Sequence, residues 1–142
     1  MTSAVWYVDS SVILRAIVNG STAARTWCSA AVKQGDAFYG SRMVELEVRR
    51  VVHNTGHTQR EADAYLDLFH LISITDDLID DAIALPYPLG GADALHIATA
   101  LKLQTLAPTL ATHDAQMAHA AQAISFPVTD PVTDDNRRPP VA

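Results

Sequence analysis

The sequence predicts an α/β domain with a central, mainly parallel sheet of four or five strands flanked by helices. Short apolar segments that suit buried strands alternate with helical segments, and this order is typical of a parallel sheet with helical crossovers. The predicted strands are Ala4–Val8, Ala37–Tyr39, Leu71–Ile74 and Thr109–Ala111, with an edge strand at Ile124–Val128. With 142 residues, 49% of them hydrophobic, the chain can build one core but is too short for two ordinary domains.

Capping residues and glycines delimit the helices that we predict in the first half of the chain. These helices run from Val12 to Val18, from Ser21 or Thr22 to about Gln34, from Ser41 to about Asn54, and from Thr58 along an apolar side that includes Phe69 and Leu71. A Ser or Thr hydroxyl suits the start of a helix because it accepts a backbone N–H that has no partner in the first turn. Gly20 and Gly35 are typical of the places where a helix stops and the chain turns.

The second half contains a predicted short helix at Asp76–Ala84, followed by a loop rich in proline and glycine. The segment from Asp93 to about Leu106 is apolar nearly all round, which indicates a buried helix, and another helix is predicted at Asp114–Ala123. The last residues are polar and proline-rich. We therefore expect a folded domain over residues 1–129 and a flexible tail over residues 130–142.

The composition bounds the classes of function. A net charge of −6 argues against a protein held on nucleic acid by bulk positive charge. Thirteen of the 16 acidic residues are Asp, which favours helix caps, turns and metal ligation over helix interiors. The single cysteine, Cys28, allows no intramolecular disulfide and no zinc site of several thiolates. Because we find neither a long apolar run nor a signal peptide, we expect a soluble, cytoplasmic protein.

Two aspartates follow predicted strands. Asp9 comes directly after the first strand, and Asp114 comes shortly after the fourth. Ligands of an open parallel sheet bind outside the carboxyl ends of its strands, so both carboxylates are expected at the same rim. The alternative for each residue is that it only caps the helix that follows, because Asp is a good N-cap.

The helix from Arg42 to Asn54 carries two glutamates on different faces. Glu45 is flanked at helical spacing by Arg42 and Arg49, which indicates a solvated, ion-paired face. Glu47 shares its face with apolar residues, and a carboxylate there must be paired, protonated or bound to a cation. We favour Glu47 as the functional residue; an ordinary ion pair between Glu47 and Arg50 is the alternative.

Asp93 opens the buried helix and completes a set of four carboxylates with Asp9, Glu47 and Asp114. Its alternative role is a favourable interaction with the helix dipole. Repulsion among four acids would raise their pKa values unless a divalent ion neutralised them. All-oxygen ligands suit Mg²⁺ or Mn²⁺, and such ions activate water and stabilise the charge that develops on a phosphodiester.

Four segments occur in the order seen in PIN-domain ribonucleases, and the sequence most closely resembles the VapC toxins of bacterial toxin–antitoxin pairs. The segments are Tyr7-Val-Asp9-Ser-Ser11, Ser41-Arg-Met-Val-Glu-Leu-Glu47-Val-Arg-Arg50, Asp93-Ala-Leu-His-Ile-Ala-Thr-Ala100 and Thr112-His-Asp114. The third segment is the most specific of them. The resemblance covers roughly residues 5–127 and implies a PIN-like three-layer fold.

The resemblance also implies roles for individual residues. Asp9 and Asp93 would be the core metal ligands, and Glu47 and Asp114 would complete the catalytic site directly or through water. Two hydroxyl side chains, Ser11 and Thr112, would support it. The implied activity is Mg²⁺- or Mn²⁺-dependent endonucleolytic cleavage of RNA, such as tRNA or another structured RNA. The implied partners are a second copy of the chain and a VapB-type antitoxin.

The sequence departs from the family pattern where RNA would approach the site. The residues just after Asp114 are Ala115-Gln116-Met117, with no basic residue among them, and Gly90-Gly91 leaves the approach to Asp93 without positive charge. The remaining basic cluster, which we expect to bind RNA weakly, consists of Arg42, Arg49 and Arg50.

Two alternatives to a ribonuclease compete. One is a catalytically silent PIN-like module that only binds a partner protein, which is disfavoured because all four acid positions are filled. The other is a phosphatase with an aspartate nucleophile after the first strand. That chemistry commonly needs a second Asp two residues later, where this chain has Ser11.

Overall fold

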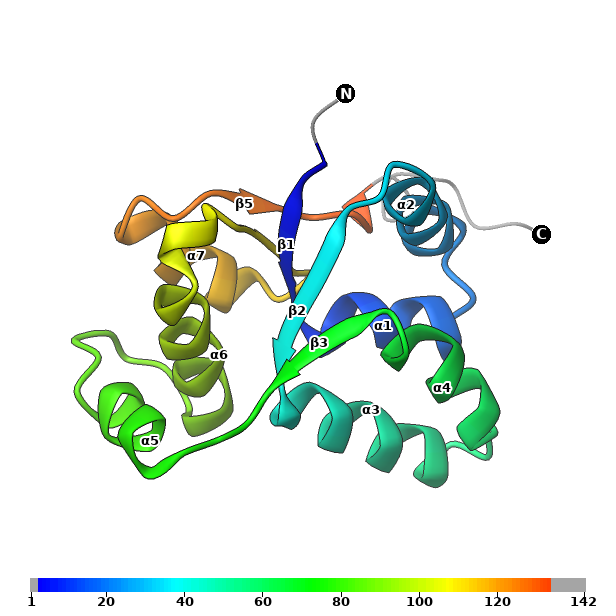
Figure 1. The fold of residues 1–142 in the computed structure, drawn as a ribbon. Coiled ribbons are helices and arrows are strands. Elements are labelled where there is room, and N and C mark those ends of the chain that lie inside the picture. The colour runs from blue at the N-terminus through cyan, green and yellow to red at the C-terminus, as the bar shows by residue number, and fades with distance from the viewer. Residues whose placement is uncertain (1–2, 134–142) are drawn as a thin grey trace.

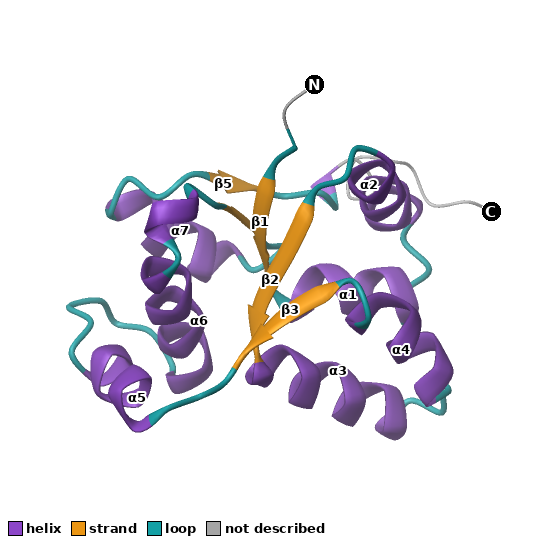
Figure 2. Cartoon of the chain, in the orientation of Figure 1, coloured by secondary structure: helices purple, strands orange, loops and turns teal. Residues whose placement is uncertain are grey.

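The computed structural model describes residues 3–133, which form a five-stranded, all-parallel sheet with helices on both faces (Figures 1 and 2). The strands are β1 (Val5–Val8), β2 (Ala37–Ser41), β3 (Phe69–Ile72), β4 (Thr109–Ala111) and β5 (Val128–Thr129). Their order across the sheet is β3-β2-β1-β4-β5, so β1 lies at the centre. The predicted α/β class and parallel sheet are therefore confirmed.

The helices form the two outer layers of a three-layer domain. They are α1 (Ser10–Ile17), α2 (Thr22–Lys33), α3 (Arg42–Asn54), α4 (Gln59–Leu66), α5 (Asp76–Ile83), α6 (Gly91–Lys102) and α7 (Ala115–Ala123), with a 3-10 turn at Gln104–Leu106. Figure 1 shows α1 to α4 on one side of the sheet and α5 to α7 on the other. Each side encloses its own apolar cluster, one around Val12, Val44 and Val48 and the other around Tyr7, Ile97 and Leu110.

The predicted N-caps are confirmed at three helices. The hydroxyls of Ser21, Ser41 and Thr58 each accept a backbone N–H of the helix that follows. Thr58 forms a capping box with Glu61, in which each residue's side chain bonds the other's backbone N–H. Local sequence therefore determines where these helices begin.

Several element boundaries differ from the prediction, and the edge strand predicted at Ile124–Val128 is the two-residue strand β5. The helix after Thr58 ends at Leu66, and Phe69 starts β3 two residues before the predicted strand because it pairs with Phe38 of β2. Apolar spacing alone did not separate the end of this helix from the strand. Helix α1 begins at Ser10, not Val12. Helix α6 begins at Gly91, so Asp93 lies inside its first turn.

The described chain continues past β5. Asp130 accepts hydrogen bonds from the backbone of Val132 and contacts the ring of His113. The side chain of Val132 is buried in the cluster that α1 to α4 cover. Residues 130–133 therefore pack against the domain. The rest of the predicted tail, residues 134–142, lies outside the described residues.

Central strands β1 and β4 end side by side, and their ends place the candidate site. The backbone N–H of Asp9 donates to the carbonyl of Ala111 at 2.9 Å, so the residues after both strands share one rim. Helix α3 starts directly after β2, the other neighbour of β1. None of the helices in the described part of the chain has the length and apolarity needed to cross a membrane.

Candidate metal centre

Asp9 is held by side chains and does not cap the helix that follows it. Although it occupies the N-cap position of α1, its side chain makes no capping hydrogen bond. Its Oδ2 accepts hydrogen bonds from Ser11 Oγ at 2.7 Å and from Thr112 Oγ1 at 3.0 Å. The carboxylate is only 4% exposed. The sequence left open whether Asp9 serves the site or only caps the following helix. The structure shows that its side chain does not cap α1.

The two hydroxyls that hold Asp9 are themselves fixed by the backbone after β4. Ser11 Oγ accepts the N–H of His113 at 2.9 Å, and Thr112 Oγ1 accepts the N–H of Asp114 at 3.0 Å. Each hydroxyl proton is consequently directed to Asp9, and the carboxylate is held in one orientation. Segments about 100 positions apart in the sequence meet in this network.

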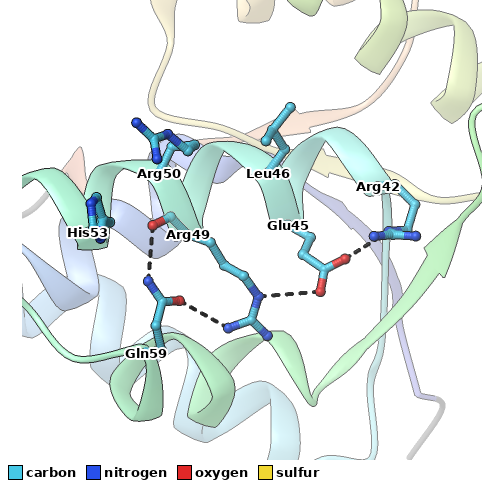
Figure 3. Close-up of a pocket in the computed structure, with 7 residues that line it drawn as sticks. All are labelled: Arg42, Glu45, Leu46, Arg49, Arg50, His53 and Gln59. Carbon is cyan, nitrogen blue, oxygen red and sulfur yellow. Dashed lines mark hydrogen bonds and ion pairs between the residues drawn. The ribbon is translucent and has the colours of Figure 1, made fainter.

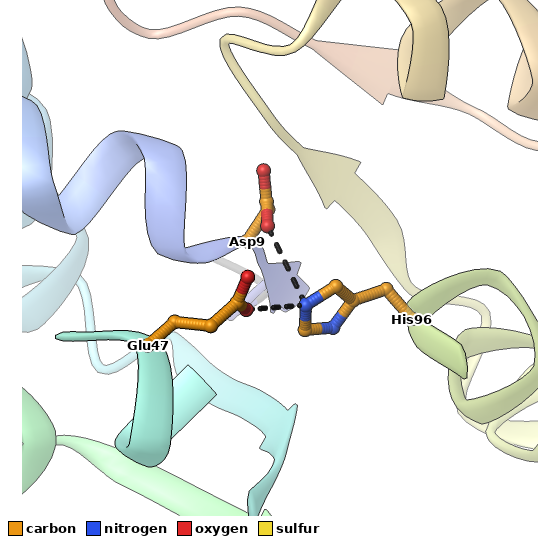
Figure 4. A group of neighbouring side chains, drawn as sticks. All are labelled: Asp9, Glu47 and His96. Carbon is orange, nitrogen blue, oxygen red and sulfur yellow. Dashed lines mark hydrogen bonds and ion pairs between the residues drawn. The ribbon is translucent and has the colours of Figure 1, made fainter. Parts of the chain in front are cut away.

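Glu47 points from α3 toward Asp9 and is paired with a histidine, not with an arginine. Its Oε1 lies 2.9 Å from His96 Nε2 and accepts a hydrogen bond from Ser10 Oγ at 3.2 Å. The same His96 nitrogen is 3.7 Å from Asp9 Oδ1 (Figure 4). Among the described residues no ion pair joins Glu47 to Arg50. The alternative of a Glu47–Arg50 pair is therefore not what the structure contains.

Sequence reasoning assigned no role to His96, although it lies one turn after Asp93 in α6. The ring is 1% exposed. Burial lowers the pKa of His96, but the hydrogen bond to Glu47 and the charges of Asp9, Glu47 and Asp93 outweigh burial, so the pKa is raised. The signal that could have indicated a role was a titratable residue in an otherwise apolar helix.

The negative charges of the other three predicted acids act on Asp93. Burial, followed by the negative charges of Asp114, Asp9 and Glu47, raises the pKa of Asp93 to about 6. The positive charge of His96 opposes this shift. We call the four predicted acids the acidic cluster below: Asp9, Glu47, Asp93 and Asp114.

Asp114 has a structural task that Asp9 lacks. Its Oδ1 accepts the N–H groups of Gln116 at 2.9 Å and Met117 at 3.1 Å, so it caps α7. Capping engages one carboxylate oxygen and leaves the charge at the rim. Asp114 can therefore cap α7 and still contribute its charge to the site.

Two acids of the cluster, Asp9 and Glu47, lie close enough together to share a divalent cation. Asp9, Glu47 and His96 each offer a ligand atom, and these atoms all lie within 4.8 Å of one another. Carboxylate oxygens suit Mg²⁺ and Mn²⁺. Burial first, and then the charges of Asp114, Asp9 and Glu47, raise the pKa of Asp93, and a bound cation would oppose both effects by favouring the ionised carboxylate.

The arginines of α3 line a surface pocket together with Glu45 (Figure 3). Arg42 and Arg49 pair with Glu45 at 2.7 Å and 3.4 Å, and Arg49 also pairs with Asp63 at 2.9 Å. The pocket is lined by Arg42, Glu45, Leu46, Arg49, Arg50, His53 and Gln59. We call Arg42, Arg49 and Arg50 the basic face. Its ion-paired character around Glu45 agrees with the sequence prediction.

Comparison with known proteins gives one consistent result. Residues 6–123 match the family model described as PIN domain. Ribonuclease VapC46 of Mycobacterium tuberculosis is 31% identical over 131 residues, which cover 88% of this chain and 96% of that protein.

Two solved structures share the fold. A toxin–antitoxin complex from Klebsiella pneumoniae has a chain with a TM-score of 0.67 and 24% identity, covering 91% of this chain and 98% of that one. A chain of VapBC2 from Rickettsia felis, bound to a DNA fragment from its promoter, gives a TM-score of 0.69 at 14% identity. The match covers 89% of this chain and 98% of that one.

Proposed function

The chain belongs to the PIN domain family, and from that premise we propose that it is a Mg²⁺- or Mn²⁺-dependent endoribonuclease. The observation that carries the proposal is the approach of two acids from separate segments, Asp9 after β1 and Glu47 of α3, whose charges together with that of Asp114 raise the pKa of Asp93 after burial. A purely structural set of acids would be expected to face solvent or arginine, whereas Asp9 is buried and held by two hydroxyls.

In this proposal each acid has its own task. Asp9 and Asp93 are the core metal ligands, and Glu47 and Asp114 complete the site directly or through water. A bound Mg²⁺ or Mn²⁺ would supply Lewis-acid activation of water and would stabilise charge on the phosphodiester. Ser11 and Thr112 keep the carboxylate of Asp9 in place, so that this carboxylate would not have to reorganise during the reaction. Cleavage would leave a 5′-phosphate and a 3′-hydroxyl.

We further propose that the protein is the toxin of a toxin–antitoxin pair. The support is its similarity to a relative named as a VapC ribonuclease and its fold similarity to chains of two toxin–antitoxin complexes. The partners would be a VapB-type antitoxin, a second copy of the chain and RNA, such as tRNA or another structured RNA. The basic face would bind RNA phosphates weakly.

The test is cleavage of a mixed RNA pool by the purified protein with Mg²⁺, with Mn²⁺ and after chelation. We expect cleavage only with a metal ion, and Asp93→Asn should abolish it while keeping the shape of the side chain. Equal cleavage by chelated wild type or by Asp93→Asn would show that the metal-carboxylate mechanism is wrong.

A growth assay separates the enzyme from a catalytically silent protein-binding module. Induced expression of the wild type should stop growth, whereas Asp9→Asn should not. If Asp9→Asn stopped growth equally well, the effect would arise from binding and the enzymatic proposal would fail.

A further inference from the structure

The buried side chains of Tyr7 and His96 form a hydrogen-bonded pair beside Glu47, and Tyr7 has no part in the roles assigned so far. His96 lies in α6 and is 1% exposed, and Tyr7 lies in β1 with no exposed surface. The hydroxyl of Tyr7 is 2.9 Å from His96 Nδ1, and the opposite ring nitrogen is 2.9 Å from Glu47 Oε1. Both ring nitrogens therefore have specific partners.

The pair closes a loop of contacts around the start of α3. The N–H of Ser41 donates to the Tyr7 hydroxyl at 3.3 Å, and the hydroxyl of Ser41 caps α3 by accepting the N–H of Met43 at 3.1 Å. Glu47 lies further along the same helix. Tyr7 is thus connected to α3 directly through its N-cap and indirectly through His96, and both connections depend on one phenolic oxygen.

Donor and acceptor chemistry determines whether Nε2 of His96, the ring nitrogen that faces Glu47, carries a proton. A nitrogen lone pair directed at a carboxylate would be repelled, whereas an N–H at Nε2 donates to Glu47 Oε1. Nδ1 can then accept the Tyr7 hydroxyl proton in the neutral ring, or donate to the Tyr7 oxygen in the charged ring. In either protonation state Glu47 receives an N–H.

The two carboxylate oxygens of Glu47 differ in their hydrogen bonds. Its Oε1 takes hydrogen bonds from His96 and Ser10, whereas Oε2 makes no hydrogen bond or ion pair within residues 3–133. With one oxygen anchored, the other is presented to the cluster in a fixed direction. Anchored ligands of this kind bind metal more tightly because less freedom is lost on binding.

We propose that His96, itself oriented by Tyr7, is a positioning residue that presents Glu47 to the metal through an Nε2–H hydrogen bond and is not itself a ligand. Imidazole is a ligand for softer ions than Mg²⁺ and Mn²⁺, which favour carboxylate oxygens and water. The proposal rests on the proposed metal-dependent function and adds to it a buried, hydrogen-bonded support for Glu47.

The first test is the affinity of the purified protein for Mn²⁺, measured by titration calorimetry. The amide nitrogen of Gln can reach the position of Nε2, whereas that of Asn reaches only the position of Nδ1. We therefore expect His96→Asn to weaken Mn²⁺ binding by about 10- to 100-fold, and His96→Gln to restore most of it. Tyr7→Phe should have a smaller effect, because the ring loses its orientation but keeps its N–H.

Two controls separate positioning from loss of packing. Phe126→Ala removes a buried ring from the apolar cluster that contains Tyr7, so it should lower the Tm without weakening Mn²⁺ binding. In a Glu47→Gln background, His96→Asn should weaken binding no further, because its effect passes through Glu47. An undiminished effect in that background, or wild-type affinity in His96→Asn, would overturn the proposal.

The second test uses the wild type, so it does not depend on how any variant folds. In NMR spectra of ¹⁵N-histidine protein, the Nε2–H of His96 should be present before Mg²⁺ is added and should remain afterwards. Its loss on Mg²⁺ binding would show that His96 is a ligand and the inference is wrong. If the wild type bound neither Mn²⁺ nor Mg²⁺, the proposed function itself would fail, which is a distinguishable result.

Discussion

Helix α3 has two faces that both carry a glutamate, yet their surroundings differ. Glu45 lies on the basic face, between Arg42 and Arg49, in ion pairs that water can screen. Glu47 points into the acidic cluster, where its partners are a buried imidazole and a serine hydroxyl. Exposed ion pairs contribute little free energy, whereas a carboxylate among other carboxylates is available to bind a cation. The comparison teaches that the surroundings of a glutamate, not its residue type, determine its role.

The largest effect is expected inside the acidic cluster. Asp9→Asn and Asp93→Asn each remove one charge with little change of shape, so both should fold and both should slow RNA cleavage by about 100-fold or more. Cleavage rates at saturating Mg²⁺, with circular dichroism as the check on folding, measure this. If either variant kept more than about a tenth of the wild-type rate, the cluster would not be the reactive centre.

Asp114 allows the charge of a cluster member to be separated from its structural task. Asp114→Asn keeps an acceptor for the α7 cap but loses the charge, so it should reduce cleavage while leaving stability nearly unchanged. Asp114→Ala removes the cap as well and should lower the free energy of unfolding by about 1 kcal/mol. Urea denaturation of both variants compares the two. Equal destabilisation by Asn and Ala would show that the cap contributes nothing.

The acidic cluster should also make stability depend on pH, and the basic face should not. Because the folded-state pKa of Asp93 is raised to about 6, its contribution to stability is present below its ordinary pKa of 3.8 and is lost as pH rises through about 6. His96, whose pKa is also raised, acts in the same direction. A cation replaces the lost proton, so the increase in Tm on adding Mn²⁺ should be larger above pH 6 than below it.

Thermal denaturation of wild type and Asp93→Asn with and without Mn²⁺ measures this dependence. In Asp93→Asn the pH dependence of the Mn²⁺ effect should shrink. A Tm increase that was the same on both sides of pH 6 in the wild type would be at odds with competition between proton and cation.

The smallest effect is expected on the basic face. Arg50 is exposed and, among the described residues, has no recorded ion pair, so it is the arginine best placed to contact phosphate. Arg50→Gln should weaken RNA binding a few-fold and lower the slope of log affinity against log salt by about 0.7, the value for one phosphate contact in single-stranded RNA. Filter binding across a salt series measures the slope. An unchanged slope would remove Arg50 from the RNA interface.

Sequence reasoning predicted the fold class and the N-caps because both depend on local patterns. The alternation of apolar and helical segments defined the parallel sheet, and Ser21, Ser41 and Thr58 mark helix starts by their own side chains. The boundary at Phe69 was missed because strand pairing with Phe38, 31 residues earlier, overrides the helical spacing of its neighbours.

Local sequence patterns predicted only part of the candidate site, because its contacts also join residues that are far apart in the sequence. Asp9 and Asp114 look alike in sequence, since each follows a strand and precedes a helix. What separates them is that Thr112, 103 residues away, holds Asp9, whereas Asp114 bonds its own helix. Likewise the partner of His96 is 49 residues distant, and no local pattern indicates it. The catalytic and metal-binding roles themselves stay predictions.

The most direct test of the account compares two substitutions on one helix, Glu47→Gln and Glu45→Gln, in Mg²⁺-dependent cleavage of RNA. Each removes one negative charge from α3 without changing the length of the side chain. We predict that Glu47→Gln slows cleavage by at least about 10-fold, whereas Glu45→Gln, on the ion-paired basic face, leaves the rate within about twofold. Equal rates for the two variants would contradict the claim that the acidic cluster is the metal centre.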